Sequence, residues 1–176
     1  DAVTLDGVFE IQVRDDIPVV DVDINKYGEV IHDESVGIQN DDTSNYWVAA
    51  RFASVANPGN DPDVAGSGAI GFASSGSSIV SVDWGDTETG ADAPALGGSY
   101  SLAILNANSG LKTTEGADIT LSLDGAGRII GTVATGVNAG KTAFASAIDG
   151  GDGEVFIAQY LSIKHPNKFD HDEEVN

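Results

Sequence analysis

The sequence predicts an all-β fold, an elaborated Ig-like β-sandwich of antiparallel strands with long acidic loops. Three observations predict it. Side chains alternate with a period of two in several segments, glycine- and aspartate-rich turns separate these segments, and almost no segment has helical spacing. The clearest case is residues 142–166, which read as two strands joined by the turn 149–153.

This predicted hairpin has apolar residues on both faces. On its first arm one face holds Phe144, Ser146 and Ile148, and the other holds Ala143, Ala145 and Ala147. On its second arm the two sets are Val155, Ile157, Leu161 and Ile163 against Phe156, Ala158 and Tyr160. A strand that is apolar on both faces is typical of a central position, so we expect the rest of the chain to lie beside this hairpin.

Further strands are expected along the chain. The segments that alternate are 3–13, 19–24, 70–72, 79–84, 100–105, 119–123 and 128–133. The Asp124-Gly125 pair between the last two is a strong hairpin signal. Residues 46–55 fit either a strand or a short helix. Residues 56–68 are predicted to be a loop and residues 106–116 a connector between strands.

Composition narrows the classes of partner. The chain has 176 residues, enough for one well-filled core, and a formal net charge of −20 from 28 acidic and 8 basic side chains. Such a charge would repel nucleic acid and anionic membranes, and it favours a divalent counter-ion. Disorder is disfavoured because 41% of the residues are hydrophobic and they alternate. No cysteine is present, which excludes disulfides, and no apolar run is long enough to cross a bilayer.

The N-terminal part suggests a junction between repeated domains. Pro18 interrupts the alternation after Arg14. The run His32–Val36 is echoed by His171–Val175, an offset of 171 − 32 = 139 residues. We therefore expect residues 1–18 to end a preceding repeat or to form a first strand plus junction, residues 19–170 to form the sandwich repeat, and residues 171–176 to start the next repeat. An echo of five residues also arises by chance, so a tandem array and coincidence both stay open.

Calcium is the leading hypothesis for the acidic side chains. Calcium takes six to eight oxygen ligands, usually carboxylates together with carbonyls from bent backbone. Four acidic pairs lie in predicted turns or junctions, and they give the candidate ligands Asp15, Asp16, Asp33, Glu34, Asp61, Asp63, Asp149 and Asp152. None has the spacing of an EF-hand loop. The competing interpretation is that these are solvated turn residues, because aspartate and glycine are ordinary turn formers.

Other chemistries find less support. Histidines 32, 165 and 171 invite a zinc or acid–base role, but no pair has helical spacing and no cysteine is available, so ordinary surface or hydrogen-bonded histidines are expected. No nucleophile elbow occurs, and an enzyme is not expected. Aromatic side chains could instead stack on sugar rings. Among Tyr46, Trp47, Trp84 and Tyr100, Trp84 is the most suggestive, although core packing is the simpler expectation for it and more strongly for Trp47.

Three runs carry a resemblance to a known family. They are HDESVG at residues 32–37, VANPGNDPDVAGSGAIGFA at residues 55–73, and AQYLSIKHPN at residues 158–167 with HDEEV at residues 171–175. These runs resemble the large T1SS-143 repeats of giant type I-secreted RTX adhesins of Gram-negative bacteria. The segment RDDIPVVDVDI at residues 14–24 resembles the junction between two such repeats. The resemblance covers nearly the whole chain, least well residues 74–98.

The resemblance implies a calcium-binding, β-rich module of a long secreted surface protein that serves in adhesion and biofilm formation. The expected function is therefore that of an extender, or spacer, module at the cell surface, a monomer whose partners are the neighbouring repeats of the same chain. The alternative is a ligand-binding adhesin domain that recognises a surface carbohydrate or a peptide. Neither function involves nucleic acid, membrane insertion or catalysis.

Overall fold

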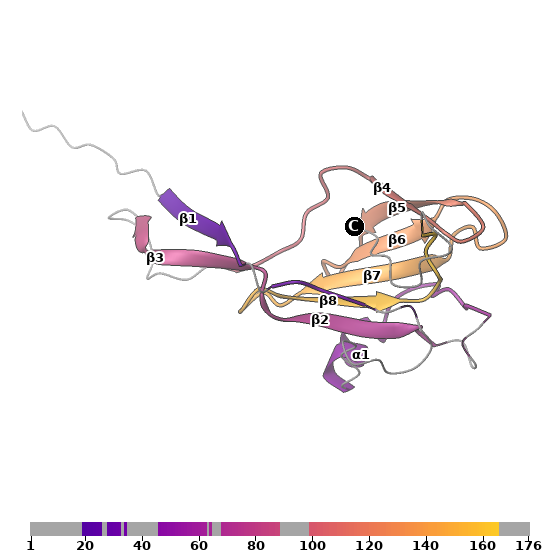
Figure 1. Cartoon of the computed structure of the whole chain (residues 1–176), viewed down its shortest axis with the longest axis horizontal. Coiled ribbons are helices and arrows are strands. Elements are labelled where there is room, and N and C mark those ends of the chain that lie inside the picture. Colours follow the sequence, from indigo (N-terminus) through magenta and orange to yellow (C-terminus); the bar gives the residue numbers. More distant parts are fainter. Residues whose placement is uncertain are drawn as a thin grey trace, which may run out of the picture. The chain divides into compact units, whose positions relative to one another are not determined.

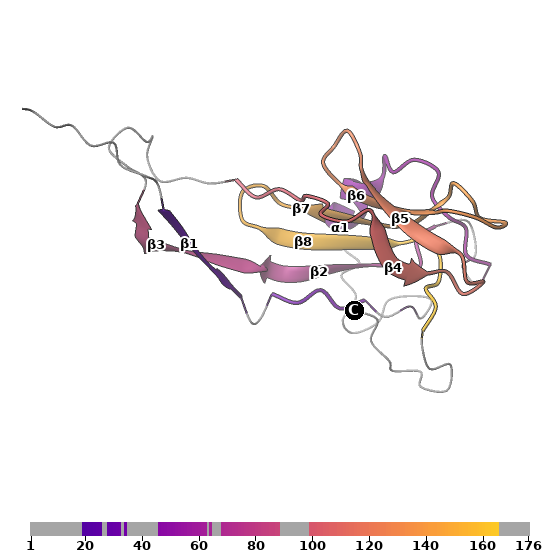
Figure 2. The ribbon, with the colours of Figure 1, turned by 90° about the horizontal axis from the view of Figure 1, so that it is seen from above.

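The structure, a computed structural model, describes residues 19–25, 28–32, 34, 46–62, 64, 68–88 and 99–165 (Figures 1 and 2). The predicted strand 3–13 lies outside this range. The chain divides into a smaller unit, Asp1–Asp23 with Val82–Gly97, and a larger one, Ile24–Ser81 with Gly98–Asn176.

The predicted all-β fold of antiparallel strands is confirmed. The elements are β1 (Val19–Ile24), α1 (Tyr46–Phe52), β2 (Gly71–Ser78), β3 (Val80–Glu88), β4 (Asn108–Lys112), β5 (Asp118–Leu123), β6 (Ile129–Val133), β7 (Thr142–Ile148) and β8 (Glu154–Gln159). One helix of seven residues occurs in the described part of the chain. Residues 46–52, for which strand and helix were both open, form that helix.

The larger unit is built on a six-stranded sheet in the order β2-β8-β7-β6-β5-β4. The hairpin β7–β8 lies in its interior, as the two apolar faces predicted, and β8 is flanked by β2 and β7 (Figure 1). Just beyond the paired residues Phe144 and Gln159, the amides of Tyr160 and Leu161 both donate to the carbonyl of Ala143. Two residues therefore oppose one at this point, which is a β-bulge.

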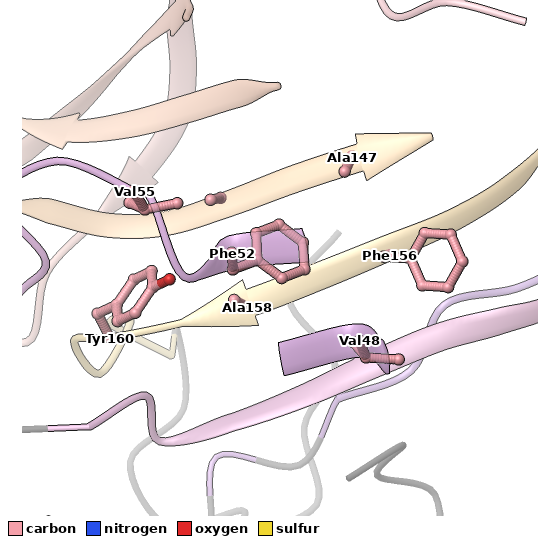
Figure 3. Close-up of a cluster of buried hydrophobic side chains, with 8 residues drawn as sticks. Val48, Phe52, Val55, Ala147, Phe156, Ala158 and Tyr160 are labelled. Carbon is pink, nitrogen blue, oxygen red and sulfur yellow. The ribbon is translucent and has the colours of Figure 1, made fainter. Parts of the chain in front are cut away.

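The helix covers one face of this sheet. Val48 and Phe52 are four residues apart, so they share the side of α1 that meets β7 and β8. The cluster between helix and sheet comprises Val48, Phe52, Val55, Ala145, Ala147, Phe156, Ala158 and Tyr160 (Figure 3). The alanine residues of β7 leave room for the rings that pack above them. Burial raises the pKa of Tyr160 to about 12, although Arg128 opposes this, so the phenol is neutral.

A second core cluster lies beyond the first along the sheet. It comprises Ile119, Val133, Ala143, Phe144 and Leu161, with Leu111, Ala117, Leu121 and Ile163 packed against it. The chain leaving β8 closes this cluster, because the Lys164 amide donates to the Lys112 carbonyl and the Thr114 amide donates to the Ser162 carbonyl. The segment after β8 therefore pairs with the end of β4, and the sheet curls around its own side chains.

The leading segment, residues 28–32 and 34, runs beside β8 on the face of the sheet opposite the helix (Figure 2). At its start, Gly28 lies so close to Ser78 and Ile79 that a Cβ atom would meet their backbone. Ser78 pairs with Glu154, the first residue of β8. At its end, Glu34 contacts Gln159, the last residue of β8. The leading segment and β8 therefore run in the same direction, as the indigo trace in Figure 2 shows.

Three expectations about strands need correction. Residues 100–105, predicted as a strand, form none, and β4 lies instead within the predicted connector 106–116. Two hydrogen bonds hold this connector against β5. The Ser109 hydroxyl donates to the Ile119 carbonyl, and the Leu121 amide donates to the Ala107 carbonyl. The short strands predicted at 70–72 and 79–84 are longer, and only Ile79 separates β2 from β3. The residues between the two predicted strands continue β2, with a register shift against β8 between Ser74 and Ser78 where Gly76 takes a positive φ of 64°.

The smaller unit holds the pairing of β1 with β3. Strand β1 confirms the strand expected at residues 19–24. Asp21, Val22 and Asp23 are all exposed, so this stretch of β1 shows no buried face. A two-stranded ribbon of this kind contributes little stability by itself.

Arg128 ties the β5–β6 turn to the helix. Its side chain is 8% exposed, and its guanidinium donates to the Asp124 carboxylate at 2.7 Å and to the carbonyl of Arg51 at 2.7 Å. Arg51 lies in the last turn of α1, where carbonyls have no partner within the helix. The contact therefore caps the helix with a positive charge, which the helix dipole favours.

Candidate functional site

The candidate site lies where the chain leaves β8, at residues 159–165. Glu34 reaches this segment from the leading segment. One of its carboxylate oxygens, Oε1, accepts hydrogen bonds from the Gln159 side chain and from the Ile163 amide, the latter at 2.8 Å. The other, Oε2, lies 3.6 Å from Nε2 of His165. The carboxylate of Glu34 thus joins the leading segment directly to the segment that leaves β8.

Asp61 binds Ser162, the residue before Ile163 in the same segment. Its Oδ2 accepts hydrogen bonds from the Ser162 amide at 3.0 Å and from the Ser162 hydroxyl at 2.8 Å. The side chain is deeply placed, since the residue is only 5% exposed. Buried carboxylates are tolerated where such hydrogen bonds replace water. Glu34 and Asp61, which belong to two different predicted acidic pairs, therefore bind consecutive backbone amides, those of Ile163 and Ser162.

The loop that carries Asp61 is held by the start of β7. Backbone carbonyls of Ala56 and Asn57 accept from the hydroxyl and the amide of Thr142, and the Gly59 amide donates to the Thr142 carbonyl. Gly59 packs on Leu161, where any side chain would collide with the leucine. Asn57 takes a positive φ of 49°, which asparagine tolerates better than most residues. This local geometry aims Asp61 at Ser162.

A small hollow of about 120 Å³ adjoins Asp61. Its lining includes the oxygen-bearing side chains of Thr114, Glu115, Asn138 and Ser162. Within the part of the chain that the structure describes, no three histidine or acidic side chains gather as a metal site would require. The described geometry therefore contains two anchored carboxylates rather than a complete set of metal ligands.

The pair Asp149 and Asp152 lies at the opposite end of β8, in the β7–β8 turn. Asp149 accepts from the Gly151 amide at 2.9 Å and pairs with the Arg51 guanidinium at 2.6 Å, and these contacts hold the pKa of its carboxyl below the usual range. The Arg51 guanidinium also lies 4.1 Å from the ring centroid of Phe156. Asp152 accepts from the Glu154 amide at 2.9 Å. Both carboxylates serve the turn itself.

The remaining four candidate ligands lie outside the described residues. They are Asp15, Asp16, Asp33 and Asp63. Along the sequence, Asp33 precedes Glu34 and Asp63 follows Asp61 by two residues.

The sequence pattern did not reveal the partners of these carboxylates. Gln159 is 4% exposed and donates to Glu34 and to the Leu161 carbonyl, and Ser162 bonds Asp61. A signal was present, because Gln159 is the one amide in a strand otherwise flanked by apolar residues. A buried glutamine needs hydrogen-bond partners, and those partners come from distant parts of the chain.

The aromatic candidates differ in how far their side chains are exposed to solvent. Trp47 was expected in the core, yet it is 76% exposed, because Val48 and Phe52 supply the buried side of the helix instead. Tyr100 is half-buried, and its ring lies beside Gly153. The side chains of Trp84 and Tyr46 lie outside the described set, as does His171.

The fold and the site define an all-β domain in which acidic side chains fasten loops to a curled antiparallel sheet. The chain belongs to a family described as a domain of unknown function, DUF5801, whose model matches residues 29–176. No curated protein and no solved structure matches the chain. Among the described residues, no helix has the length and apolar character needed to span a bilayer.

Proposed function

We propose that the chain is a calcium-binding extracellular extender module of a large repetitive bacterial surface adhesin, with a role in adhesion and biofilm formation. The observation that carries this proposal is the convergence of Glu34 and Asp61 on the amides of Ile163 and Ser162. Two acidic side chains, 61 − 34 = 27 residues apart in sequence, bind neighbouring amides there, in a chain of net charge −20. The similarity of the sequence to RTX adhesin repeats supplies the extracellular setting.

A divalent cation suits this region because it would offset the repulsion between carboxylates. Each of the two carboxylates uses one oxygen for a backbone amide, and the second oxygen of Glu34 lies 3.6 Å from Nε2 of His165. Asp33 and Asp63 supply further oxygens nearby in the sequence. In the adhesin setting, the cation would be scarce in the cytosol and abundant outside, so folding would follow export.

Calcium is expected to raise the melting temperature of the chain relative to EDTA. A ligand that binds only the folded state stabilises it by about 2.7 kcal/mol when present at a hundred times its dissociation constant. Melting followed by circular dichroism in EDTA, in millimolar calcium and in millimolar magnesium would measure this. Identical curves in EDTA and calcium would remove calcium from the proposal. The double variant Glu34→Gln/Asp61→Asn should show a smaller calcium shift than the control Asp118→Asn, whose carboxylate is 65% exposed on β5.

The second candidate is a ligand-binding adhesin domain that recognises a carbohydrate or a peptide. The exposed indole of Trp47 favours it, because aromatic faces offered to solvent suit stacking on sugar rings. On this hypothesis, binding to a glycan or peptide array is expected to fall at least about tenfold in Trp47→Ala. Trp84→Ala should be assayed in parallel. Binding that is unchanged in both variants would count against this candidate.

A further inference from the structure

The leading segment starts beside the first residue of β8 and runs along the strand to Glu34, which contacts the segment that leaves β8 at its other end. Asn25 bonds the backbone of Ser78 and Ile79, beside the first residue of β8. The chain leaves at the other end, beyond Gln159. Because the leading segment and β8 run in the same direction, tension applied between residues 28 and 165 would act along the strand. Such tension shears the hydrogen bonds of β8 together instead of opening them one at a time.

Glu34 and Asp61 connect the leaving segment to the rest of the unit at this point. Glu34 bonds Gln159 and Ile163, and Asp61 bonds Ser162 twice. We call these five residues the exit clamp. In two of its bonds a backbone amide donates to a charged carboxylate oxygen, which makes them stronger than neutral hydrogen bonds. The loop that carries Asp61 is itself anchored, because its backbone is hydrogen-bonded to Thr142.

We propose that the exit clamp is a force-bearing element, which resists extension when the module is pulled along its own chain. This inference rests on the proposed function as an extender, because only a tethered module experiences such tension. The clamp spans the leading segment and the leaving segment directly, so load reaches its bonds before it reaches the sheet. The carboxylates of Glu34 and Asp61 resist extension through their hydrogen bonds, whether or not a cation is bound.

The absence of cysteine from the chain makes the direction of pulling selectable. Two introduced cysteines define the points where force is applied in single-molecule force spectroscopy. Cysteines at the exposed positions Glu29 and Lys164 load the chain along β8. Cysteines at the exposed positions Ser77 and Gly125 load the same full-length chain across the strands.

The variants are Glu34→Gln and Asp61→Asn, and Asp118→Asn is the matched control on β5, since its exposed pair with Lys112 lies outside the clamp. For pulling along β8, each clamp variant should raise the unfolding rate at constant force by about tenfold. For pulling across the strands, the rise should stay below about threefold. Ser162→Ala, which removes only the hydroxyl donor to Asp61, should raise the rate along β8 by about threefold and provides a milder test if the other variants fold poorly.

The proposal is overturned if the clamp variants weaken both pulling directions equally, because the residues are then general stabilisers. It is also overturned if they behave like Asp118→Asn along β8. Repeating the measurement in EDTA separates the two proposals. If calcium does not bind, the difference between the two pulling directions should remain. A difference that appears only with calcium would assign the resistance to the cation and contradict the proposal for the clamp.

Discussion

Replacement of Asp61 by alanine is expected to lower the free energy of unfolding by about 3 kcal/mol. The change removes two charge-assisted hydrogen bonds and leaves the amide and hydroxyl of Ser162 without this acceptor at a site that is 5% exposed. Buried polar groups that lose their partner cost more than the bond itself contributed. Urea denaturation followed by tryptophan fluorescence would measure the change, with an unchanged slope as the sign that the native fold is retained.

The control for this prediction is Asp118→Ala. Its ion pair with Lys112 is exposed on both sides, so its loss should cost no more than about 1 kcal/mol. A loss of similar size in the two variants would contradict the role assigned to burial at Asp61.

Arg128→Met is expected to destabilise the protein by about 3 kcal/mol at neutral pH. The methionine keeps much of the side-chain volume, but the guanidinium bonds to the Asp124 carboxylate and to the Arg51 carbonyl are lost. The matched control is Arg51→Met. The Arg51 side chain is 37% exposed, and its pair with Asp149 and its contact with Phe156 should together contribute only about 1 kcal/mol. Equal losses would show that the cap on the helix is unimportant.

Acid provides a second measurement of the Arg128 contact. Partial burial raises the pKa of Asp124, but hydrogen bonds from Arg128 and Ala126 and the positive charge outweigh it, so the pKa lies below its ordinary value of 3.8. A lowered pKa in the folded state adds stability above pH 3.8, and this stability is lost as the pH falls through the folded value. The wild-type chain should therefore lose more stability than Arg128→Met between pH 5 and about pH 2. Parallel acid profiles of the two proteins would contradict the assignment.

The hairpin β7–β8 shows how much of the packing could be predicted from the alternation of side chains. Alternation put Ala145 and Ala147 on one face of the first arm and Phe156 and Ala158 on one face of the second, and the structure brings these two sets together in the cluster under α1. The pattern failed at Ala143, which joins Phe144 in the other cluster because the pairing of β7 with β6 shifts there: Gly131 pairs with Phe144, but Thr132 pairs with Thr142. A register shift depends on the partner strand, so alternation in one segment cannot reveal it.

The same limit applies to the candidate site. The sequence identified Glu34 and Asp61 as acidic residues in loops, and the structure places both in the described fold. Their partners, Gln159 and Ser162, are separated from them by 125 and 101 residues. Asp149 was grouped with them by composition alone, yet it lies at the other end of β8 with Arg51 as its partner.

The sequence by itself determined that this protein is all-β, acidic, without disulfides and centred on one apolar hairpin, because alternation and composition are local properties. Only the tertiary structure decided that Glu34 and Asp61, from two different acidic pairs, bind the chain at one end of β8, while Asp149 and Asp152 lie in the turn at the other end. It also decided that Trp47 faces solvent. These outcomes depend on which distant segments become neighbours, and burial and hydrogen bonding select those neighbours only when the whole sheet forms.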